Sequence, residues 1–433
     1  MIHLPFDIIA YWVTFLRDDP GTLITCASLN RLWHQACRPH IFQRIVVDVR
    51  KHTTDPLVKL ESFLDSDRSI GPLVQELRLR FLISDRERGN SYESWICDVP
   101  RLLLTRLPYV HSLEIIGLGL PNDDFPPTFY EELQQLVYIK RLSLVYCCTL
   151  YDVLNGFVSN LPNLTELHIH GQWLATRLSG QDDFDLDRIP LPRNIPKLKT
   201  FYYHNDDASG PSTLAFLEWI RPIKTLKSVG IHIDRDIALK DVAQFFRERG
   251  DSLEQVEIRF LDRSDYWEWD EAHPEGNARQ KVIQDHFDLK ALKSLQTLHI
   301  HTVDHVSGAP FLAQVAKTRP QRIVITDTAW DLDACVKTAE PLELDNILSS
   351  PTFEYLHEIL FIYRGITQKK DTVLELFPKL HSQDKIRFLW AKADAVGTPD
   401  SALEPSPYAD DYPPPGFVLL TLAFFALLCL AFP

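Results

Sequence analysis

The chain has 433 residues and a formal net charge of −14, with 45% hydrophobic and 24% charged residues. These values are typical of a globular protein with a substantial core, in one large domain or two to three ordinary ones. A protein that binds mainly nucleic acid needs a basic face, and the sequence has no long stripe of lysine and arginine. We therefore expect no nucleic-acid partner. The acidity would suit a basic protein surface or serve solubility alone.

The seven cysteines fit neither a disulfide framework nor a zinc site, because their number is odd and no two are spaced as Cys-x-x-Cys. The first residues, MIHLPFDII, lack the cationic and apolar regions of a secretory signal. Both features favour a reducing compartment, the cytoplasm or the nucleus. We expect neither a metal nor a cofactor.

Three short helices are expected in residues 1–50. Pro5 suits the first position of a helix, Asp19-Pro20 begins a second helix, and Asn30 caps a third that Pro39 is expected to end. So small a unit buries too little surface to be comfortably stable alone, and it has more apolar residues than three short helices can hide. Exposed apolar surface of this kind marks protein–protein sites, so the segment predicts a protein partner.

The same segment resembles the F-box of fungal F-box proteins. The resemblance rests on Leu4-Pro5, Ile8-Ile9, Leu16, Asp19, Leu23, Cys26, Leu29, Trp33 and the run Arg38-Pro39-His40-Ile41-Phe42, and SIGPLVQELRLR extends it. In that family this region docks onto the adaptor subunit of SCF-type cullin–RING ubiquitin ligases. The resemblance implies that the adaptor-binding residues are Leu4, Pro5, Ile8, Ile9, Leu16, Leu23, Cys26 and Trp33. Trp12 departs from the smaller aliphatic residue usual there. Alternatively, the helices form an N-terminal cap on the rest of the chain.

A recurring spacing predicts the structure of residues 73–395, after a connecting helix in residues 51–72. An apolar residue is followed by another three positions on and a third two positions after that, as in Val74/Leu77/Leu79, Val110/Leu113/Ile115, Leu164/Leu167/Ile169, Leu226/Val229/Ile231, Leu295/Leu298/Ile300 and Leu356/Ile359/Phe361. The spacing resembles the core of leucine-rich repeats. The predicted fold is therefore a three-helix F-box followed by an irregular leucine-rich-repeat solenoid, of α+β or α/β class. The alternative is an ordinary α/β domain with alternating strands and helices.

The residues between the strand leucines are expected to line one face, because strand side chains alternate. That rule places polar residues together: Arg78, Arg80, Glu114, Glu166, His168, His170, Tyr202, His204, His232, Glu257, Arg259, His299 and His301. His168/His170 and His299/His301 have a spacing that could chelate a metal, but no cysteine or carboxylate is placed to complete four ligands. We interpret the face as a polar surface, or as a recognition surface whose charge changes near neutral pH.

Residues 262–276, DRSDYWEWDEAHPEG, alternate aromatic and acidic side chains. Tyr266, Trp267 and Trp269 suit contacts with a basic partner segment, although a surface loop that folds back onto the body is an equal alternative. The expected residues for binding a protein target are therefore His168, His170, His204, His232, Arg259, Tyr266, Trp267, Trp269, His299 and His301. The acidic run 181–190 is expected to be solvated.

Residues 396–416 are rich in proline and acidic side chains and predict a linker. The final 17 residues, 417–433, carry no charge; as a helix they would extend about 25 Å, slightly short of a hydrocarbon core of about 30 Å. A membrane anchor is one interpretation of this segment, although no basic residue flanks it. A docked hydrophobic end or a wrong reading frame are the others.

No phosphate-binding loop, nucleophile elbow or zinc-protease motif occurs in the sequence. The prediction is a non-catalytic substrate-recognition subunit of an SCF-type ubiquitin ligase, which binds the ligase adaptor through residues 1–50 and an unknown protein target through the body. The alternative is a protein-interaction scaffold without a ligase role, which residues 417–433 would tether to a membrane if they are an anchor.

Overall fold

The structure is a computed structural model that describes most of the first 391 residues. The described residues are 4–17, 19–50, 56–82, 96–117, 125–145, 147, 149–170, 174–175, 197–204, 213–233, 236–260, 289–302, 312, 314–315, 318–327, 345–364, 374–375 and 377–391. The chain divides into two compact units. Unit 1 comprises Met1–Leu298 with Ala313–Pro320, and unit 2 comprises His299–Leu312 with Gln321–Pro433.

The dominant element is a single 12-stranded, all-parallel sheet in the order β1-β2-β3-β4-β6-β8-β9-β10-β11-β12-β13-β14. The predicted fold, a three-helix F-box followed by an irregular leucine-rich-repeat solenoid, is therefore wrong, and the arrangement is α/β. The spacing that suggested separate repeats marks the buried positions of successive strands in one continuous sheet. Parallel strands joined by helices, the alternative weighed from the sequence, place apolar residues in the same way.

The strands of unit 1 are joined mostly through helices. Within it lie β1 (Arg44–Arg50), β2 (Glu76–Leu82), β3 (Ser112–Ile116), β4 (Arg141–Val145), β6 (Glu166–His170), β8 (Thr200–His204), β9 (Ser228–Ile233) and β10 (Gln255–Phe260), while β11 spans Thr297–Thr302. The helices are α4 (Pro56–Ser66), α6 (Val99–Arg106), α7 (Pro127–Gln135), α8 (Tyr151–Asn160), α9 (Thr213–Ile220) and α10 (Asp236–Arg249). Two short strands, β5 (Thr149–Leu150) and β7 (Leu174–Ala175), form a separate pair.

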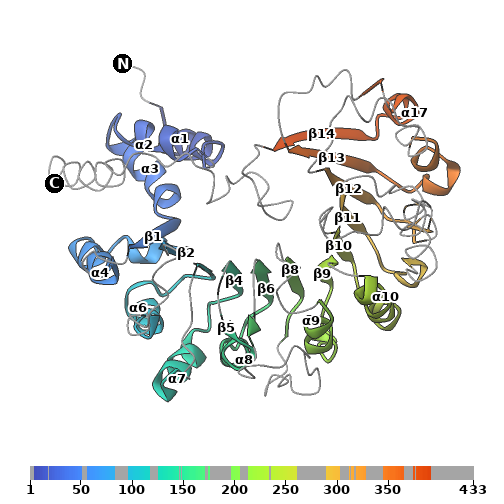
Figure 1. Cartoon of the computed structure of the whole chain (residues 1–433). Coiled ribbons are helices and arrows are strands. Elements are labelled where there is room, and N and C mark those ends of the chain that lie inside the picture. The colour runs from blue at the N-terminus through green and yellow to red at the C-terminus, as the bar shows by residue number, and fades with distance from the viewer. Residues whose placement is uncertain are drawn as a thin grey trace. The chain divides into compact units, whose positions relative to one another are not determined.

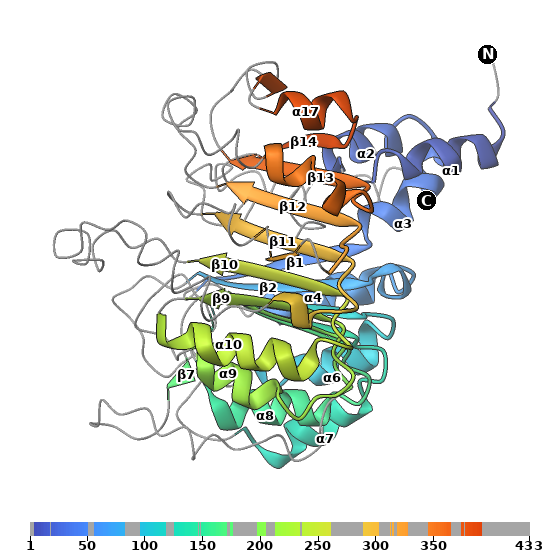
Figure 2. The same ribbon diagram turned by 90° about the vertical axis from the view of Figure 1, so that its right-hand side faces the viewer.

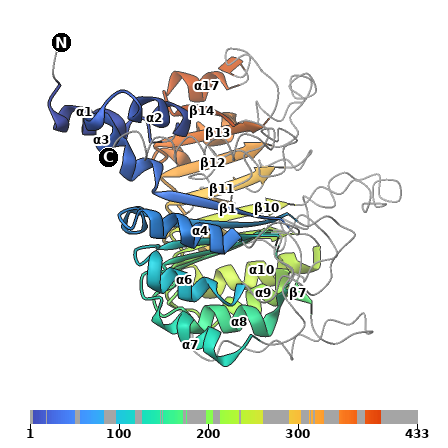
Figure 3. The same ribbon diagram turned by 90° about the vertical axis from the view of Figure 1, so that its left-hand side faces the viewer.

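In unit 1 the helices α4 and α6 to α10 all lie on one face of the strands (Figures 1, 2 and 3). Strand order follows chain order, and crossovers between parallel strands are right-handed, so each helix is carried to the same side. The core lies between strands and helices, where Leu142, Leu167 and Val229 have no exposed surface. The opposite face of these strands carries the polar side chains.

Three helices precede the sheet: α1 (Phe6–Thr14), α2 (Pro20–Ala27) and α3 (Arg31–Ile41). The predicted caps of the second and third are confirmed, because Asp19 accepts a hydrogen bond from the Thr22 N–H and Asn30 accepts one from the Leu32 N–H. Pro5 lies one residue before α1 rather than at its first position. Pro39 does not end α3, which runs two residues further. The proline removes one intrahelical hydrogen bond, the one its own position would make to the Gln35 carbonyl, and the two residues after it still continue the helix.

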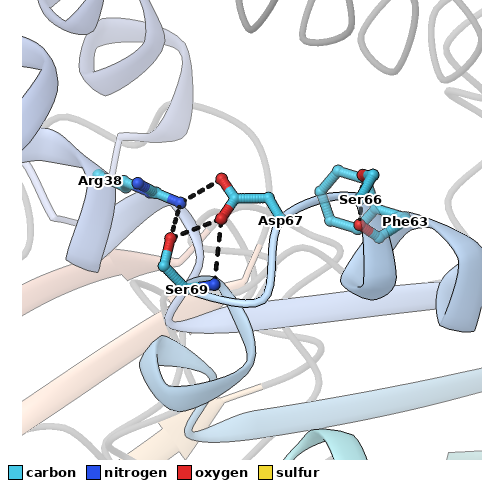
Figure 4. A network of polar contacts seen from close by, with 5 residues as sticks. All are labelled: Arg38, Phe63, Ser66, Asp67 and Ser69. Carbon is cyan, nitrogen blue, oxygen red and sulfur yellow. Dashed lines mark hydrogen bonds and ion pairs between the residues drawn. The ribbon is translucent and has the colours of Figure 1, made fainter. Parts of the chain in front are cut away.

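A polar network joins the end of α3 to the segment that follows α4 (Figure 4). Arg38 Nη2 lies 2.5 Å from Asp67 Oδ2 and 2.5 Å from Ser69 Oγ. The Ser69 N–H in turn donates to Asp67 Oδ1 at 3.0 Å. The Asp67 carboxylate therefore has donors on both oxygens, and it attaches α3 to the segment between α4 and β2.

The sheet begins earlier in the chain than was expected from the sequence, which placed the first strand after residue 72. β1 covers Arg44–Arg50 and pairs with β2 over seven residues, although residues 1–50 were assigned wholly to the helical unit. The β-branched run Ile45–Val47 was the available signal. The connecting helix expected in residues 51–72 is present as α4, and Gly71–Leu73 form a single 3-10 turn, η1.

Unit 2 contains β12 (Arg322–Asp327), β13 (Glu358–Arg364) and β14 (Ile386–Ala391), which pair in parallel. Its short helix α17 (Pro378–Ser382) is capped by Asp345, a buried carboxylate that accepts hydrogen bonds from the Lys379 and Leu380 N–H groups. Residues 396–433, with the predicted linker and apolar segment, lie outside the described residues. Within the described ranges, no helix is both long enough and apolar enough to cross a membrane.

Candidate functional site

Helix α1 has two apolar faces. Ile9 and Val13 point inward, with 2% and 0% of their surface exposed, and pack in a core with Leu23, Ala27, Ala36 and Cys37. On the other side Ile8, Tyr11, Trp12 and Phe15 are 43%, 62%, 50% and 68% exposed. Because residues three and four apart share a helix face, these four side chains form one stripe, which we call the outer stripe. The rings of Tyr11 and Phe15 meet edge to face at 5.0 Å.

The residues expected to bind the ligase adaptor fall into three groups by exposure. Pro5 and Ile8 are exposed. Leu4, Leu16, Cys26 and Trp33 are partly buried and pack against the core of the three helices. Ile9 and Leu23 belong to that core, so they hold the helices together and do not face a partner.

Exposed apolar surface was expected on these helices, but most of the residues that form it were not named from the sequence. Besides the outer stripe, Phe6, Leu29 and Leu32 are 43%, 62% and 39% exposed. The missed signal was that α1 is apolar on more than one side. A helix that is hydrophobic nearly all round, at the surface of a small unit, cannot bury every face.

Helices α2 and α3 carry one cysteine each, Cys26 and Cys37. Cys37 is buried and Cys26 partly buried, and both are free thiols. Burial, with a smaller contribution from Cys26, raises the pKa of the Cys37 thiol to about 11. A thiol with so high a pKa is a poor nucleophile at neutral pH, so Cys37 serves packing.

The second candidate is a set of polar side chains on adjacent strands of unit 1, which we call the polar face. Its members are His168 and His170 on β6, Tyr202 and His204 on β8, Ser228 and His232 on β9, and Glu257 and Arg259 on β10. The strand register places His170 beside His204, and His232 beside Arg259. Their alternation with buried Leu167 and Val229 puts them on the face away from the helices.

Contacts tie the members of the polar face together. His204 Nε2 lies 3.3 Å from Glu257 Oε1. The Tyr202 hydroxyl lies 3.0 Å from Ser228 Oγ, and the rings of His168 and Tyr202 have centroids 4.8 Å apart. A β-carbon at Gly230 would overlap the Tyr202 ring, so only glycine lets this ring lie across β9.

Two histidines of the polar face are held neutral. Burial, and then the positive charge of Arg141, lowers the pKa of His168 to about 3, although Glu257 opposes this. The pKa of His204 lies well below its usual value because of burial first and Arg259 next, again against Glu257. Desolvation disfavours the charged imidazole more than one carboxylate favours it.

Much of the polar face is closed to a partner. His204, His232, Glu257 and Arg259 are at most 7% exposed, whereas His168, His170 and Tyr202 are half-buried. Of the residues expected to bind a target, the structure brings His168, His170, His204, His232 and Arg259 together, and only the first two keep accessible surface. Tyr266, Trp267 and Trp269 lie outside the described residues.

His299 and His301 belong to unit 2 and are 3% and 0% exposed. Their rings lie 4.1 Å apart, and His299 Nε2 is 2.7 Å from the hydroxyl of Thr326. Two imidazoles on one strand supply two of the four ligands that a structural zinc site needs.

No protein-family model matches the chain, and no curated protein sequence is significantly similar to it.

Proposed function

We propose that the protein is a non-catalytic substrate-recognition subunit of an SCF-type cullin–RING ubiquitin ligase, in the cytoplasm or nucleus. In this proposal, helices α1 to α3 bind the ligase adaptor, and the sheet-bearing part of the chain binds a protein target. The observation that carries it is the outer stripe of α1, an exposed apolar surface in the segment whose sequence resembles an F-box.

The energetics of the outer stripe favour a protein partner. Burying one large apolar side chain stabilises a complex by about 1.5–3 kcal/mol. Ile8, Tyr11, Trp12 and Phe15 together present several such side chains side by side, next to the exposed Pro5. Aromatic residues in a contiguous patch are the usual energetic centre of a protein–protein interface.

The proposed target-binding surface contains only some of the residues that the sequence predicted for it. His168, His170 and Tyr202 are the accessible members of the polar face, while the buried Glu257 contacts His204 beneath them. With His168 neutral at physiological pH, its ring offers a hydrogen bond and stacking rather than positive charge.

The test is binding of the full chain to a purified SCF adaptor subunit, measured by calorimetry. The triple variant Ile8→Ala, Trp12→Ala, Phe15→Ala should bind at least about 30-fold more weakly, because the truncation of such anchors costs about 2 kcal/mol or more. The matched control is Tyr109→Ala, Val137→Ala, Tyr138→Ala, which removes exposed apolar side chains elsewhere in unit 1. No binding by the unaltered chain, or equal loss in both triple variants, would refute the proposal and favour a scaffold without a ligase role.

A further inference from the structure

A third surface lies at the edge of unit 1 where the parallel strands begin. The residues just before β4, β6, β8 and β9 continue the ladder of the sheet, because each donates its N–H to the residue before the preceding strand. Lys140 donates to the His111 carbonyl, Thr165 to Lys140, Lys199 to Thr165 and Lys227 to Lys199, each at 2.8 Å. The segments before neighbouring strands are therefore adjacent in space.

This edge is basic although the chain is acidic. None of residues 106–111, 136–140, 161–165, 197–199 and 221–227 is aspartate or glutamate, in a chain of net charge −14. Four lysines, Lys140, Lys197, Lys199 and Lys224, are exposed there. Across the part of the chain that the structure describes, none of these four forms an ion pair, whereas the neighbouring Lys227 pairs with Glu254 at 2.6 Å. We call the four residues the lysine edge.

An exposed aromatic pair adjoins the lysine edge. Tyr109, before β3, and Tyr138, before β4, are 52% and 53% exposed, and their rings meet edge to face at 5.8 Å. Val137 beside them is 47% exposed. Tyrosine combines a large apolar ring with a hydroxyl, so an exposed pair in mutual contact suits an apolar side chain of a partner.

We infer that this edge binds an acidic, extended segment of a protein partner. The carboxylates of the segment would lie along the lysine edge, and one of its apolar or aromatic side chains would pack on Tyr109 and Tyr138. The net charge of −14 repels a long polyanion, so the occupant is short, and the exposed tyrosine pair beside the lysine edge favours a peptide that carries an apolar side chain. The inference goes beyond the proposed function and stands without it, because it uses no residue of α1 to α3 or of the polar face.

The test uses the full chain and fluorescein-labelled synthetic peptides, with binding followed by fluorescence anisotropy. The probe is EEDEWEDEE, and the comparison peptides are EEDEAEDEE and KKRKWKRKK. We expect EEDEWEDEE to bind, EEDEAEDEE to bind at least about tenfold more weakly for want of its anchor, and the basic peptide not to bind. Binding should weaken as salt is raised, because exposed charges are screened.

Two charge-reversal variants assign the binding to the edge. Lys140→Glu with Lys199→Glu should weaken binding of EEDEWEDEE by about tenfold or more. Lys59→Glu with Arg101→Glu is the matched control, since both residues are exposed on helices and the change in net charge is the same. The double variant Tyr109→Ala with Tyr138→Ala should abolish the preference for EEDEWEDEE over EEDEAEDEE.

Three outcomes would overturn the inference: no binding of EEDEWEDEE by the unaltered chain, equal weakening by the two charge-reversal variants, or equally tight binding of a single-stranded RNA of nine nucleotides. The proposed function assigns adaptor binding to the outer stripe of α1 and uses Tyr109 and Tyr138 only as a control, so a failure here leaves the proposed function untouched, and the reverse also holds.

Discussion

The outer stripe of α1 and the polar face of β6 to β10 depart from ordinary packing in opposite directions. The stripe exposes Trp12 and Phe15 to water, whereas the polar face buries Glu257, Arg259 and His232. An exposed apolar stripe costs little folding free energy when nothing covers it, but a buried charge is expensive unless other groups compensate it. The two regions therefore differ in what their residues do: those of the stripe are free to serve a partner, and the buried members of the polar face are committed to one another.

The first way to break this comparison is Glu257→Ala. The carboxylate lies 3.3 Å from His204 Nε2 on the same buried face as Arg259. Its removal takes the hydrogen-bond acceptor from the neutral His204 and leaves the buried guanidinium with less compensating charge, and the loss of one charge from such a buried set costs about 3–5 kcal/mol. We expect the free energy of unfolding of unit 1 to fall by that amount, measured by hydrogen exchange of the amides in β8 to β10.

The control for this prediction is Glu254→Ala, three residues earlier. Glu254 pairs with Lys227 at 2.6 Å on the surface, and such pairs contribute at most about 1 kcal/mol. Equal losses in the two variants would show that the burial of Glu257 carries no special cost.

A smaller effect is expected from Leu23→Ala in the core of α1 to α3. Leu23 is 1% exposed, and removing a buried leucine side chain costs about 2–5 kcal/mol. Phe15→Ala removes a larger ring that is 68% exposed, and we expect a change within about 0.5 kcal/mol. Hydrogen exchange of the α1 to α3 amides measures both, and a large loss with Phe15→Ala would mean that the outer stripe is covered.

Local chemistry was readable from the sequence. Asp19 and Asn30 cap their helices as expected, because a short polar side chain before a helix has few other partners for its oxygen. The alternation of Leu167 with His168 and His170 likewise gave the polar side of a strand, since the strand period is fixed by covalent geometry.

What the sequence could not give was the assembly of these elements. The same apolar spacing serves separate repeats and one continuous parallel sheet, so it favoured the wrong architecture, and β1 was absorbed into the helical unit. The burial of His204 and Glu257 could not be seen either, because it depends on neighbours on other strands. At the lysine edge, Lys140 and Lys199 are 59 positions apart in sequence. The hydrogen bonds between the segments before the strands show that only Thr165, the residue before β6, lies between them.

Gly230→Ala probes the close packing of the polar face. The added methyl group would overlap the Tyr202 ring, and overpacking of this kind costs about 1–3 kcal/mol. Tyr202→Ser in the same chain should recover most of that loss, because it removes the ring that the methyl group meets. Thermal unfolding of the single and double variants measures the coupling. Additive losses would show that the ring has another position to occupy.

The smallest expected effect is a loss of folding stability in mild acid, which should be larger in the strands of the polar face than in helices α1 to α3. His168 in the folded protein has a pKa of about 3, below the ordinary value of 6.5, and that of His204 is lowered in the same direction. Below pH 6.5 the unfolded chain therefore takes up protons on these histidines, whereas the folded polar face keeps them neutral. Their contribution to stability is complete above pH 6.5 and is lost as the pH falls toward 3. At pH 5.5 the protonation of His168 in the unfolded chain alone costs on the order of 1 kcal/mol.

Hydrogen exchange at pH 7.5 and 5.5, corrected for the intrinsic exchange rate, should show this loss in β6 to β10. Helices α1 to α3 should lose less, because their one comparable group, the half-buried His34, has a pKa lowered by burial and then by Arg38 but raised again by Asp67. His168→Gln should reduce the pH dependence of the stability of β6 to β10, because the unfolded variant takes up about one proton fewer on acidification. If both regions weaken equally, the histidines of the polar face are protonated while folded, and the face is open to water like the outer stripe.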